Sequence, residues 1–394
     1  MKKGWEYKEL GELCHKFNGL WKGKKAPFVR VGVIRNANFT KAFTLDFSNI
    51  EYLDVEEKQY ASRKLQLGDL IVEKSGGSEK QPVGRAVLFQ EKEGEYSFSN
   101  FTSVLRVKDN HEITPEFLYK YILHVYLRGD TRKMQKATTG IHNIEFDKYL
   151  AIKIPVPPLS EQKEIVEYLD SSFAKIDKLK ENAAKNLEEA KALFQSALND
   201  ALEPKEGWEE KTMDEVCILS QGLAINSKTK HLLVEKSSIP LLRIKDMQDG
   251  TREIFVDDKN YPPKCLAHPD ELIYTRTGTL GLIFTGMFGI VHNNCFKIKL
   301  DEKILNKYYY MYFVGSDNFR NMILSIASRA AQPDITHKLF KVQKIQFPTL
   351  SEQQSIVSFL DSLNEKVNTL QQNYSRICDE CDALKQAILR QVFE

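Results

Sequence analysis

A twelve-residue stretch of this chain occurs twice. Residues 159–170 read Leu-Ser-Glu-Gln-Lys-Glu-Ile-Val-Glu-Tyr-Leu-Asp, and residues 350–361 read Leu-Ser-Glu-Gln-Gln-Ser-Ile-Val-Ser-Phe-Leu-Asp. Eight of the twelve positions are identical at an offset of 191, and Gly4-Trp5-Glu6 returns as Gly207-Trp208-Glu209 at an offset of 203. Such an internal duplication predicts a chain built as domain, helix, domain, helix. The predicted bounds are 1–158, 159–206, 207–349 and 350–394.

Each copy of the stretch opens a predicted long helix, because no glycine or proline follows it up to residue 203 in the first copy or up to residue 394 in the second. Ser160 and Ser351 are the predicted N-caps. Apolar residues then recur at alternating spacings of four and three, which is typical of a coiled-coil seam. The seam positions are Leu169, Phe173, Ile176, Leu179, Ala183, Leu187, Ala190, Phe194 and Ala197, and Ile356, Leu360, Leu363, Val367, Leu370, Tyr374, Ile377, Cys381, Leu384 and Ile388.

The short connection between the first helix and the second domain constrains the topology. Only three residues, Pro204, Lys205 and Glu206, separate them, so the second helix is expected to begin near the end of the first. A parallel pair would require the chain to travel the whole helix, about 65 Å at 1.5 Å per residue. We therefore expect an α+β protein in which two mixed α/β domains lie at opposite ends of an antiparallel two-helix coiled coil.

Composition and charge limit the class of protein. The 394 residues are 42% hydrophobic, without a run of about 20 apolar residues or an apolar leader. Together with six scattered cysteines, this predicts a cytoplasmic protein with reduced thiols. The net charge of +2 divides into +6 and +3 for the two predicted domains and −4 and −3 for the two helices. Basic domains and acidic helices fit domains that approach phosphate groups.

Catalytic and metal-binding motifs are not found. The sequence lacks the phosphate-binding GxxxxGK[ST] and GxGxxG patterns and the Asp/Asn-Pro-Pro-aromatic tetrapeptide of aminomethyltransferases. Pro333-Asp334 is interpreted as part of a loop, since no Glu-x-Lys follows it. Cys378 and Cys381 lie within the second helix and are interpreted as packing residues, because zinc would need further ligands. The scattered histidines are interpreted as structural.

Basic residues at matched positions are the candidate DNA contacts. Predicted strands at 69–73 and 271–275 each lead into a glycine-containing loop that begins with Lys74 or Arg276, and Arg30 and Arg243 lie on strands interpreted as equivalent. Any one of these cations could instead be a solvated surface charge, but their recurrence in two domains favours DNA contact. The full candidate set is Lys22, Lys24, Lys25, Arg30, Lys74, Arg132, Lys133, Lys136, Arg243, Lys245, Arg276 and Arg329.

Nearly the whole chain resembles the specificity subunits of type I DNA restriction-modification systems. The resemblance depends on the duplicated helix entry (Pro157 to Gln162, and Pro348 to Gln353), the Gly-Trp domain openings and the two strand-loop segments. It implies a non-catalytic subunit that binds a bipartite double-stranded DNA target, one half for each target recognition domain, with the helices setting the spacing. It also implies two methyltransferase subunits that hold S-adenosylmethionine, and restriction/translocase subunits that use ATP and magnesium. No cofactor or membrane is expected for this chain itself.

Two other functions remain open at this stage. The chain could be an enzyme that acts on DNA by itself, although the missing cofactor and metal motifs argue against that. It could also be an inactive or shuffled specificity subunit that acts only as a coiled-coil assembly adaptor. Salt-dependent DNA binding would distinguish a DNA-reading subunit from an adaptor.

Overall fold

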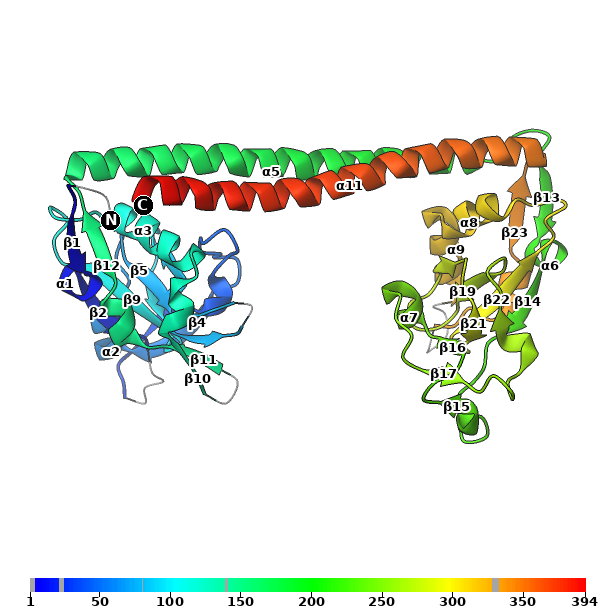
Figure 1. Ribbon diagram of the computed structural model, residues 1–394, viewed down its shortest axis with the longest axis horizontal. Coiled ribbons are helices and arrows are strands. Elements are labelled where there is room, and N and C mark those ends of the chain that lie inside the picture. The colour runs from blue at the N-terminus through cyan, green and yellow to red at the C-terminus, as the bar shows by residue number, and fades with distance from the viewer. Residues whose placement is uncertain (1–3, 21–24, 80, 139–140, 328–332) are drawn as a thin grey trace. The chain divides into compact units, whose positions relative to one another are not determined.

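The computed structural model of this chain describes residues 4–20, 25–79, 81–138, 141–327 and 333–394. It contains two compact units (Figure 1): unit 1 comprises Met1–Ala183 and Tyr374–Glu394, and unit 2 comprises Ala184–Asn373. Two 44-residue helices, α5 (Leu159–Leu202) and α11 (Leu350–Phe393), each contribute to both units. The duplicated, mixed α/β fold is therefore confirmed, while the four-part division of the sequence stays a prediction.

Unit 1 contains four small sheets, with strand orders β2-β9-β5-β7, β4-β3-β8, β10-β11-β6 and β1-β12. The strands are β1 (Glu6–Glu9), β2 (Cys14–Asn18), β3 (Phe28–Ile34), β4 (Glu51–Glu56), β5 (Leu70–Glu73), β6 (Ser75–Gly77), β7 (Ala86–Leu88), β8 (Tyr96–Phe98), β9 (Thr102–Val107), β10 (Gln135–Thr138), β11 (Ile141–Ile144) and β12 (Lys153–Val156). The shorter helices are α1 (Leu10–Leu13), η1 (Asn36–Asn38), α2 (Glu57–Arg63), α3 (Pro115–Leu127), η2 (Asp130–Met134) and α4 (Phe146–Leu150).

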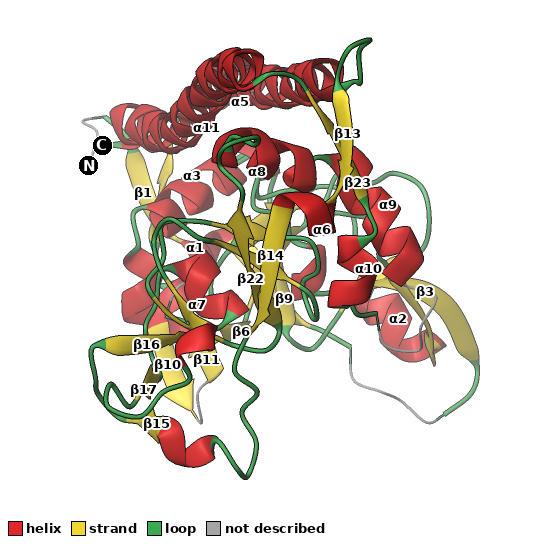
Figure 2. Cartoon of the chain, turned by 90° about the vertical axis from the view of Figure 1, so that its right-hand side faces the viewer, coloured by secondary structure: helices red, strands yellow, loops and turns green. Residues whose placement is uncertain are grey.

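Unit 2 has a related plan with three described sheets, in the strand orders β14-β22-β19-β20, β15-β17-β16-β21-β18 and β13-β23. Its strands are β13 (Glu209–Thr212), β14 (Cys217–Gln221), β15 (Leu233–Val234), β16 (Ile239–Leu242), β17 (Phe255–Val256), β18 (Leu266–Ala267), β19 (Leu272–Thr275), β20 (Ile283–Phe284), β21 (Gly289–Val291), β22 (Cys295–Leu300) and β23 (Lys344–Phe347). Figure 2 shows β14 beside β22, with which it pairs antiparallel. The helices are α6 (Met213–Val216), η3 (Lys230–Leu232), α7 (Ile244–Asp249), η4 (Pro263–Cys265), α8 (Lys307–Gly315), α9 (Asp317–Ala327) and α10 (His337–Lys341).

The strands β5 and β19 are buried on both faces, which fixes the loops that follow them. In β5, Leu70 and Val72 face the core that includes α3, while Ile71 faces a second core on the other side of the sheet. In β19, Leu272 and Tyr274 face the core that includes α8, and Ile273 faces the opposite side. Alternating side chains of a strand point to opposite faces. Because both faces of β5 and β19 are packed, the position at which each strand ends is fixed, and Lys74 and Arg276 follow directly after these ends.

The two long helices are antiparallel within each unit. In unit 1, Asp177 pairs with Lys385 (2.5 Å) and Lys180 pairs with Asp382 (2.6 Å), so rising residue numbers on α5 meet falling numbers on α11. In unit 2, Leu198 and Leu202 of α5 share a core with Val357 and Leu360 of α11. Among the described residues no helix is sufficiently long and apolar to cross a membrane.

The predicted seam is only partly buried. Cys381 is buried with Sγ 4.0 Å from the carbonyl oxygen of Ile176, which confirms its interpretation as a packing residue. Leu179, Leu370 and Leu384, however, are 56%, 38% and 47% exposed. A two-helix pair encloses one narrow stripe, and the remaining apolar positions are covered only where a globular core reaches them. Three leucines of the predicted seam are therefore exposed, while Leu169, Ile176 and Leu360 at other seam positions are buried.

The caps of the long helices also differ from the prediction. The helices begin at Leu159 and Leu350, one residue before Ser160 and Ser351. The Thr349 hydroxyl instead accepts a 3.4 Å hydrogen bond from the Glu352 amide, and the Thr349 carbonyl accepts the Gln353 amide. Pro158, which is equivalent to Thr349, has no hydroxyl and cannot make this bond in the first helix. The predicted N-caps Ser160 and Ser351 were wrong, because both serines lie inside the first turn of their helices.

The repeated glutamine of the helix entry fastens each helix to its domain. Gln162 is fully buried: its Nε2 donates to the carbonyls of Glu112 (2.9 Å) and Pro157 (2.8 Å), and its Oε1 accepts the Thr114 amide (2.9 Å). Gln353 makes the same three bonds in unit 2. The duplication therefore preserves a polar contact between the start of the long helix and the loop before α3 or α8.

His124 is a buried histidine in α3 of unit 1. Its Nε2 lies 3.4 Å from Oε1 of Glu394, and its ring packs against Phe393 with centroids 5.5 Å apart. Burial, followed by the positive charge of Arg128, lowers the pKa of His124, while Glu394 and Asp130 partly oppose the shift. The folded unit therefore favours the neutral imidazole.

This burial predicts a pH dependence of stability. The unfolded chain takes up the His124 proton near its ordinary pKa of about 6.5, whereas the folded chain takes it up only at lower pH. The contribution is thus present above about pH 6.5 and is lost as the pH falls below it. We expect the free energy of unfolding to fall from pH 7 to pH 5, and His124→Gln to lessen that fall in denaturant titrations. An identical slope in the variant would contradict this assignment.

Candidate nucleic-acid interface

The loops after β5 and β19 are held in the same way. The Lys74 amide donates to the Phe101 carbonyl (2.9 Å), and the Lys74 carbonyl accepts the Ile144 amide (2.8 Å). In unit 2 the Arg276 amide donates to Asn294 (2.8 Å), and the Arg276 carbonyl accepts the Ile335 amide (3.0 Å). Lys74 and Arg276 are therefore structurally equivalent, as the sequence predicted.

Arg276 is tied to its own unit. Its Nε donates to Oδ1 of Asp334 at 2.9 Å, and a second guanidinium nitrogen contacts Oδ2 of the same carboxylate. Nη1 also donates to Oε1 of Gln221 at 3.1 Å. This bidentate pair fixes the planar guanidinium. The loop aspartate of Pro333-Asp334 thus has a defined partner that lies 58 positions earlier in the chain.

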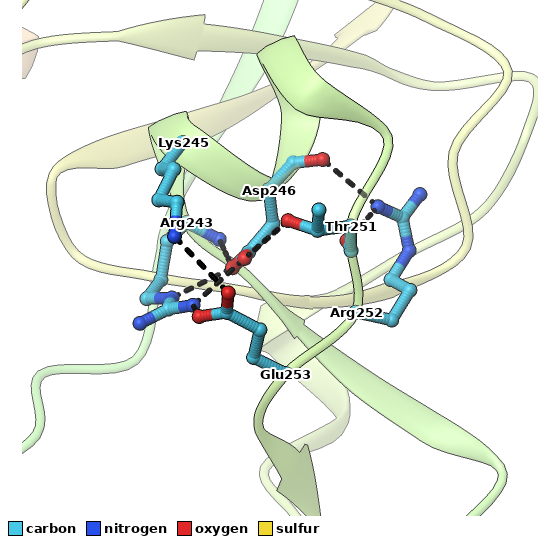
Figure 3. Close-up of polar contacts among 6 residues, drawn as sticks. All are labelled: Arg243, Lys245, Asp246, Thr251, Arg252 and Glu253. Atoms are coloured by element: carbon cyan, nitrogen blue, oxygen red, sulfur yellow. Dashed lines mark hydrogen bonds and ion pairs between the residues drawn. The ribbon is translucent and has the colours of Figure 1, made fainter. Parts of the chain in front are cut away.

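Arg243 lies in a second, denser cluster (Figure 3). Its Nε and Nη2 donate to the two oxygens of Asp246, both at 2.7 Å, and Nη2 also donates to Glu253 at 2.7 Å. Lys245 reaches the other oxygen of Glu253 at 3.0 Å. Burial alone would raise the pKa of Asp246, but the hydrogen bonds from Arg243 lower it overall. Both carboxylates of the cluster are held ionised by the neighbouring cations.

The equivalent of Arg243 is Arg35, not Arg30. The carbonyl before each arginine accepts a matching amide: Ile34 accepts Ser99 (2.9 Å), and Leu242 accepts His292 (3.1 Å). Arg30 lies earlier in β3, is exposed, and approaches Asp54 at 3.6 Å. The interpretation of Arg30 and Arg243 as equivalent was wrong because β3 has seven residues and β16 has only four. Arg35 was missed, although the Arg-x-x-Asn and Arg-x-x-Asp spacing after each strand could have revealed it.

Lys74 has a different environment from Arg276. It is half-buried, and within the described part of the chain its amine has neither a hydrogen bond nor an ion pair. Burial, followed by the positive charge of Lys16, lowers the pKa of Lys74. A half-buried ammonium without a counter-ion is suited to accept an anion from outside the protein.

The other candidates are exposed and less ordered by contacts. Lys25 lies before β3, Arg132 and Lys133 lie in η2, and Lys136 lies in β10. The Arg132 Nη1 donates to the Glu79 carbonyl at 2.9 Å. β10 pairs with β11, and β11 pairs with β6, which begins directly after Lys74. Lys136 therefore lies in the small sheet that the chain enters just after Lys74. Lys22, Lys24 and Arg329 lie outside the described residues.

Several buried polar atoms near these loops have no hydrogen-bond partner. In unit 1 they include Nε of Arg35, Oδ1 of Asn36, Oγ of Ser99 and Nδ1 of His142. Asn36 also donates to the Ser75 carbonyl of the glycine-containing loop. Buried polar groups are normally paired, so these atoms are additional candidates for contact with a bound molecule or water. In the described ranges no three His, Cys, Asp or Glu side chains are grouped to hold a metal ion.

A duplicated α/β binding module, with basic loop residues at equivalent places in both units and part of a helix pair in each, defines the class of this protein. The family model for the type I restriction modification DNA specificity domain matches it twice, at residues 2–189 and 205–377. The chain therefore belongs to the family of type I restriction-modification DNA specificity proteins.

Individual relatives agree with this membership. The chain is 26% identical over 397 residues to the type I restriction enzyme StySPI specificity subunit of Salmonella potsdam, covering 93% of this chain and 81% of that protein. It is 25% identical to the EcoKI specificity subunit of Escherichia coli K12, with the same coverage. The HsdS subunit from Thermoanaerobacter tengcongensis has a similar fold, with a TM-score of 0.59 at 19% identity over all of this chain and 97% of that one. A chain solved in work on assembly of the type I R-M system gives a TM-score of 0.80 at 19% identity, covering 100% of this chain and 98% of that one.

Proposed function

We propose that this chain reads a bipartite double-stranded DNA target, with one half-site for each unit. The observation that carries the proposal is the recurrence of a cation on the same two loops of both units, Lys74 and Arg276 after the buried strand, and Arg35 and Arg243 after the neighbouring one. Such cations can contact phosphate or the acceptor edges of bases, and arginine can do so with two parallel hydrogen bonds. The spacing between half-sites is set by α5 and α11.

The chain itself is proposed to perform no chemistry and to organise the subunits that do. Two methyltransferase subunits would hold S-adenosylmethionine, and restriction/translocase subunits would use ATP and magnesium. Their docking is supported by apolar side chains that the helices leave exposed, among them Leu179, Leu193 and Leu384. Exposed apolar surface of this kind is common where a soluble protein binds a partner.

Exchanging residues 207–349 for the corresponding segment of another family member tests the division of labour. We expect one half of the methylated target to change, while the other half and the gap stay as they were, because unit 1 and the helices are retained. Genome-wide mapping of modified adenines in cells that carry each version measures this outcome. The reciprocal exchange of residues 1–158 is the matched control and is expected to alter only the other half.

A simultaneous change of both halves in either exchange would contradict the proposed function. If the unaltered chain assembles with its partner subunits but shows no sequence-dependent DNA binding, it is an assembly adaptor instead.

A further inference from the structure

Two equivalent positions next to the loop cations differ in charge between the units. Asn143 precedes Ile144 in unit 1, and Asp334 precedes the equivalent Ile335 in unit 2. Likewise, the Arg35 amide donates to the side chain of Asn38 (2.9 Å), and the Arg243 amide donates to the side chain of Asp246 (3.2 Å). Unit 1 therefore carries a neutral amide at both places where unit 2 carries a carboxylate.

The carboxylates of Asp246 and Asp334 form ion pairs with the two loop arginines of unit 2. Asp246 is fully buried and accepts hydrogen bonds from the backbone amide and two side-chain nitrogens of Arg243. Asp334 is half-exposed and binds Arg276 through two nitrogens. A guanidinium in a bidentate carboxylate pair has fewer donors for an external phosphate, and the carboxylate repels that phosphate.

The Asn38 amide of unit 1 does not act in this way. Nδ2 of Asn38 donates to the carbonyls of Asp46 (3.2 Å) and Asn49 (3.0 Å), so the amide holds the following loop. The Nε of Arg35 is left without a partner, although its Nη1 still contacts Glu51. Lys74, the equivalent of Arg276, has no carboxylate partner in the described part of unit 1.

We propose that Asp246 and Asp334 restrain the phosphate affinity of unit 2, so that unit 1 supplies the larger share of the salt-dependent, sequence-independent affinity for DNA. The inference rests on the proposed function, since it assumes that these loops face DNA. DNA binding by unit 2 would then depend more on the base sequence of its own half-site. Its arginines must give up part of their ion pairs with Asp246 and Asp334 to bind DNA, and only well-placed contacts at the correct half-site offset that loss.

The test uses the full chain and a mixed-sequence DNA duplex, with binding measured over a range of salt concentrations. Each phosphate contact adds about 0.9 to the slope of log K against log salt. Asp334→Asn is expected to make that slope steeper by about 0.9, because Arg276 becomes free for phosphate. Asparagine keeps the shape of the side chain, and the position is half-exposed, so the fold should tolerate the change.

The opposite substitution in unit 1 should have the opposite effect. Asn143→Asp puts a carboxylate at the position equivalent to Asp334 and is expected to make the slope shallower by a similar amount. Glu302→Gln is the matched control for net charge: Glu302 is exposed in the segment between β22 and α8, so removing its charge releases no arginine.

The outcomes separate the inference from the proposed function. The inference is supported if the slope of log K against log salt is steeper for Asp334→Asn and shallower for Asn143→Asp than for the parent, while the slope for Glu302→Gln stays close to that of the parent. If the parent binds DNA with a clear salt dependence but the two loop variants match it or match the charge control, the inference is overturned and the proposed function stands. If the parent shows no salt-dependent binding, the proposed function fails as well.

Discussion

Replacing Gln353 by leucine is expected to lower the free energy of unfolding by about 3 kcal/mol, because buried polar groups lose their partners. The side chain is fully buried and makes three hydrogen bonds: to the carbonyls of Ile304 (3.0 Å) and Pro348 (2.8 Å), and from the amide of Asn306 (2.7 Å). Leucine has a similar volume, so the loss comes from three orphaned backbone groups rather than from a cavity.

The adjacent residue provides a matched control for this prediction. Gln354 is exposed and accepts one hydrogen bond, from Nδ2 of Asn306 at 3.0 Å. Gln354→Leu should therefore change the free energy of unfolding by about 0.5 kcal/mol or less, as is usual for surface substitutions. Both variants can be compared by denaturant titration followed by circular dichroism. Equal losses would show that the three buried bonds do not hold the helix to its domain.

The same test in unit 1 uses Gln162, whose three bonds repeat the pattern. Each glutamine bonds the first turn of a long helix to the loop that precedes α3 in unit 1 or α8 in unit 2. The same side chain bonds both the end of the segment before its helix (Pro157 or Pro348) and the loop before α3 or α8 (Glu112 or Ile304), so it fixes the start of the helix relative to that loop. The repeated Leu-Ser-Glu-Gln stretch thus anchors the start of each long helix to the globular part of its own unit.

The sequence was sufficient to predict features that repeat at a constant offset. The two long helices and the predicted strands at 69–73 and 271–275 agree with the structure, since their apolar patterns reflect local periodicity. The antiparallel pairing followed from the length of a three-residue connection. These predictions required only local geometry and chain length.

The contacts of the site could not be predicted in the same way. Arg276 finds Asp334 58 positions away, and the pairing depends on how β19 and the segment before α10 meet. The equivalence of Arg35 and Arg243 was hidden by strands of unequal length, so matching the two strands by sequence alone pointed to the wrong arginine. Candidate cations could be recognised from the sequence, but whether each is free or already paired is a property of tertiary structure.

A second large effect is expected where α11 enters the core of unit 1. Phe393 is buried, and its ring lies edge-to-face with Phe117 and Tyr121, at centroid distances of 5.7 and 5.1 Å. Phe393→Ala removes this packing and leaves a cavity, so we expect the free energy of unfolding to fall by about 3–5 kcal/mol. Denaturant titration and hydrogen exchange of α3 would measure the loss.

Leu384 in the same helix is the control, because it is 47% exposed. Leu384→Ala should cost less than about 1 kcal/mol, since little apolar surface leaves a packed core. If instead Phe393→Ala were as mild as Leu384→Ala, the end of α11 would not be part of the folded core of unit 1. In that case the antiparallel pairing seen there would depend only on surface contacts such as Asp177 with Lys385. A strong and selective loss would show that α11 is held by the hydrophobic core into which α3 packs, which is what a rigid connection between the long helix and the globular part of unit 1 requires.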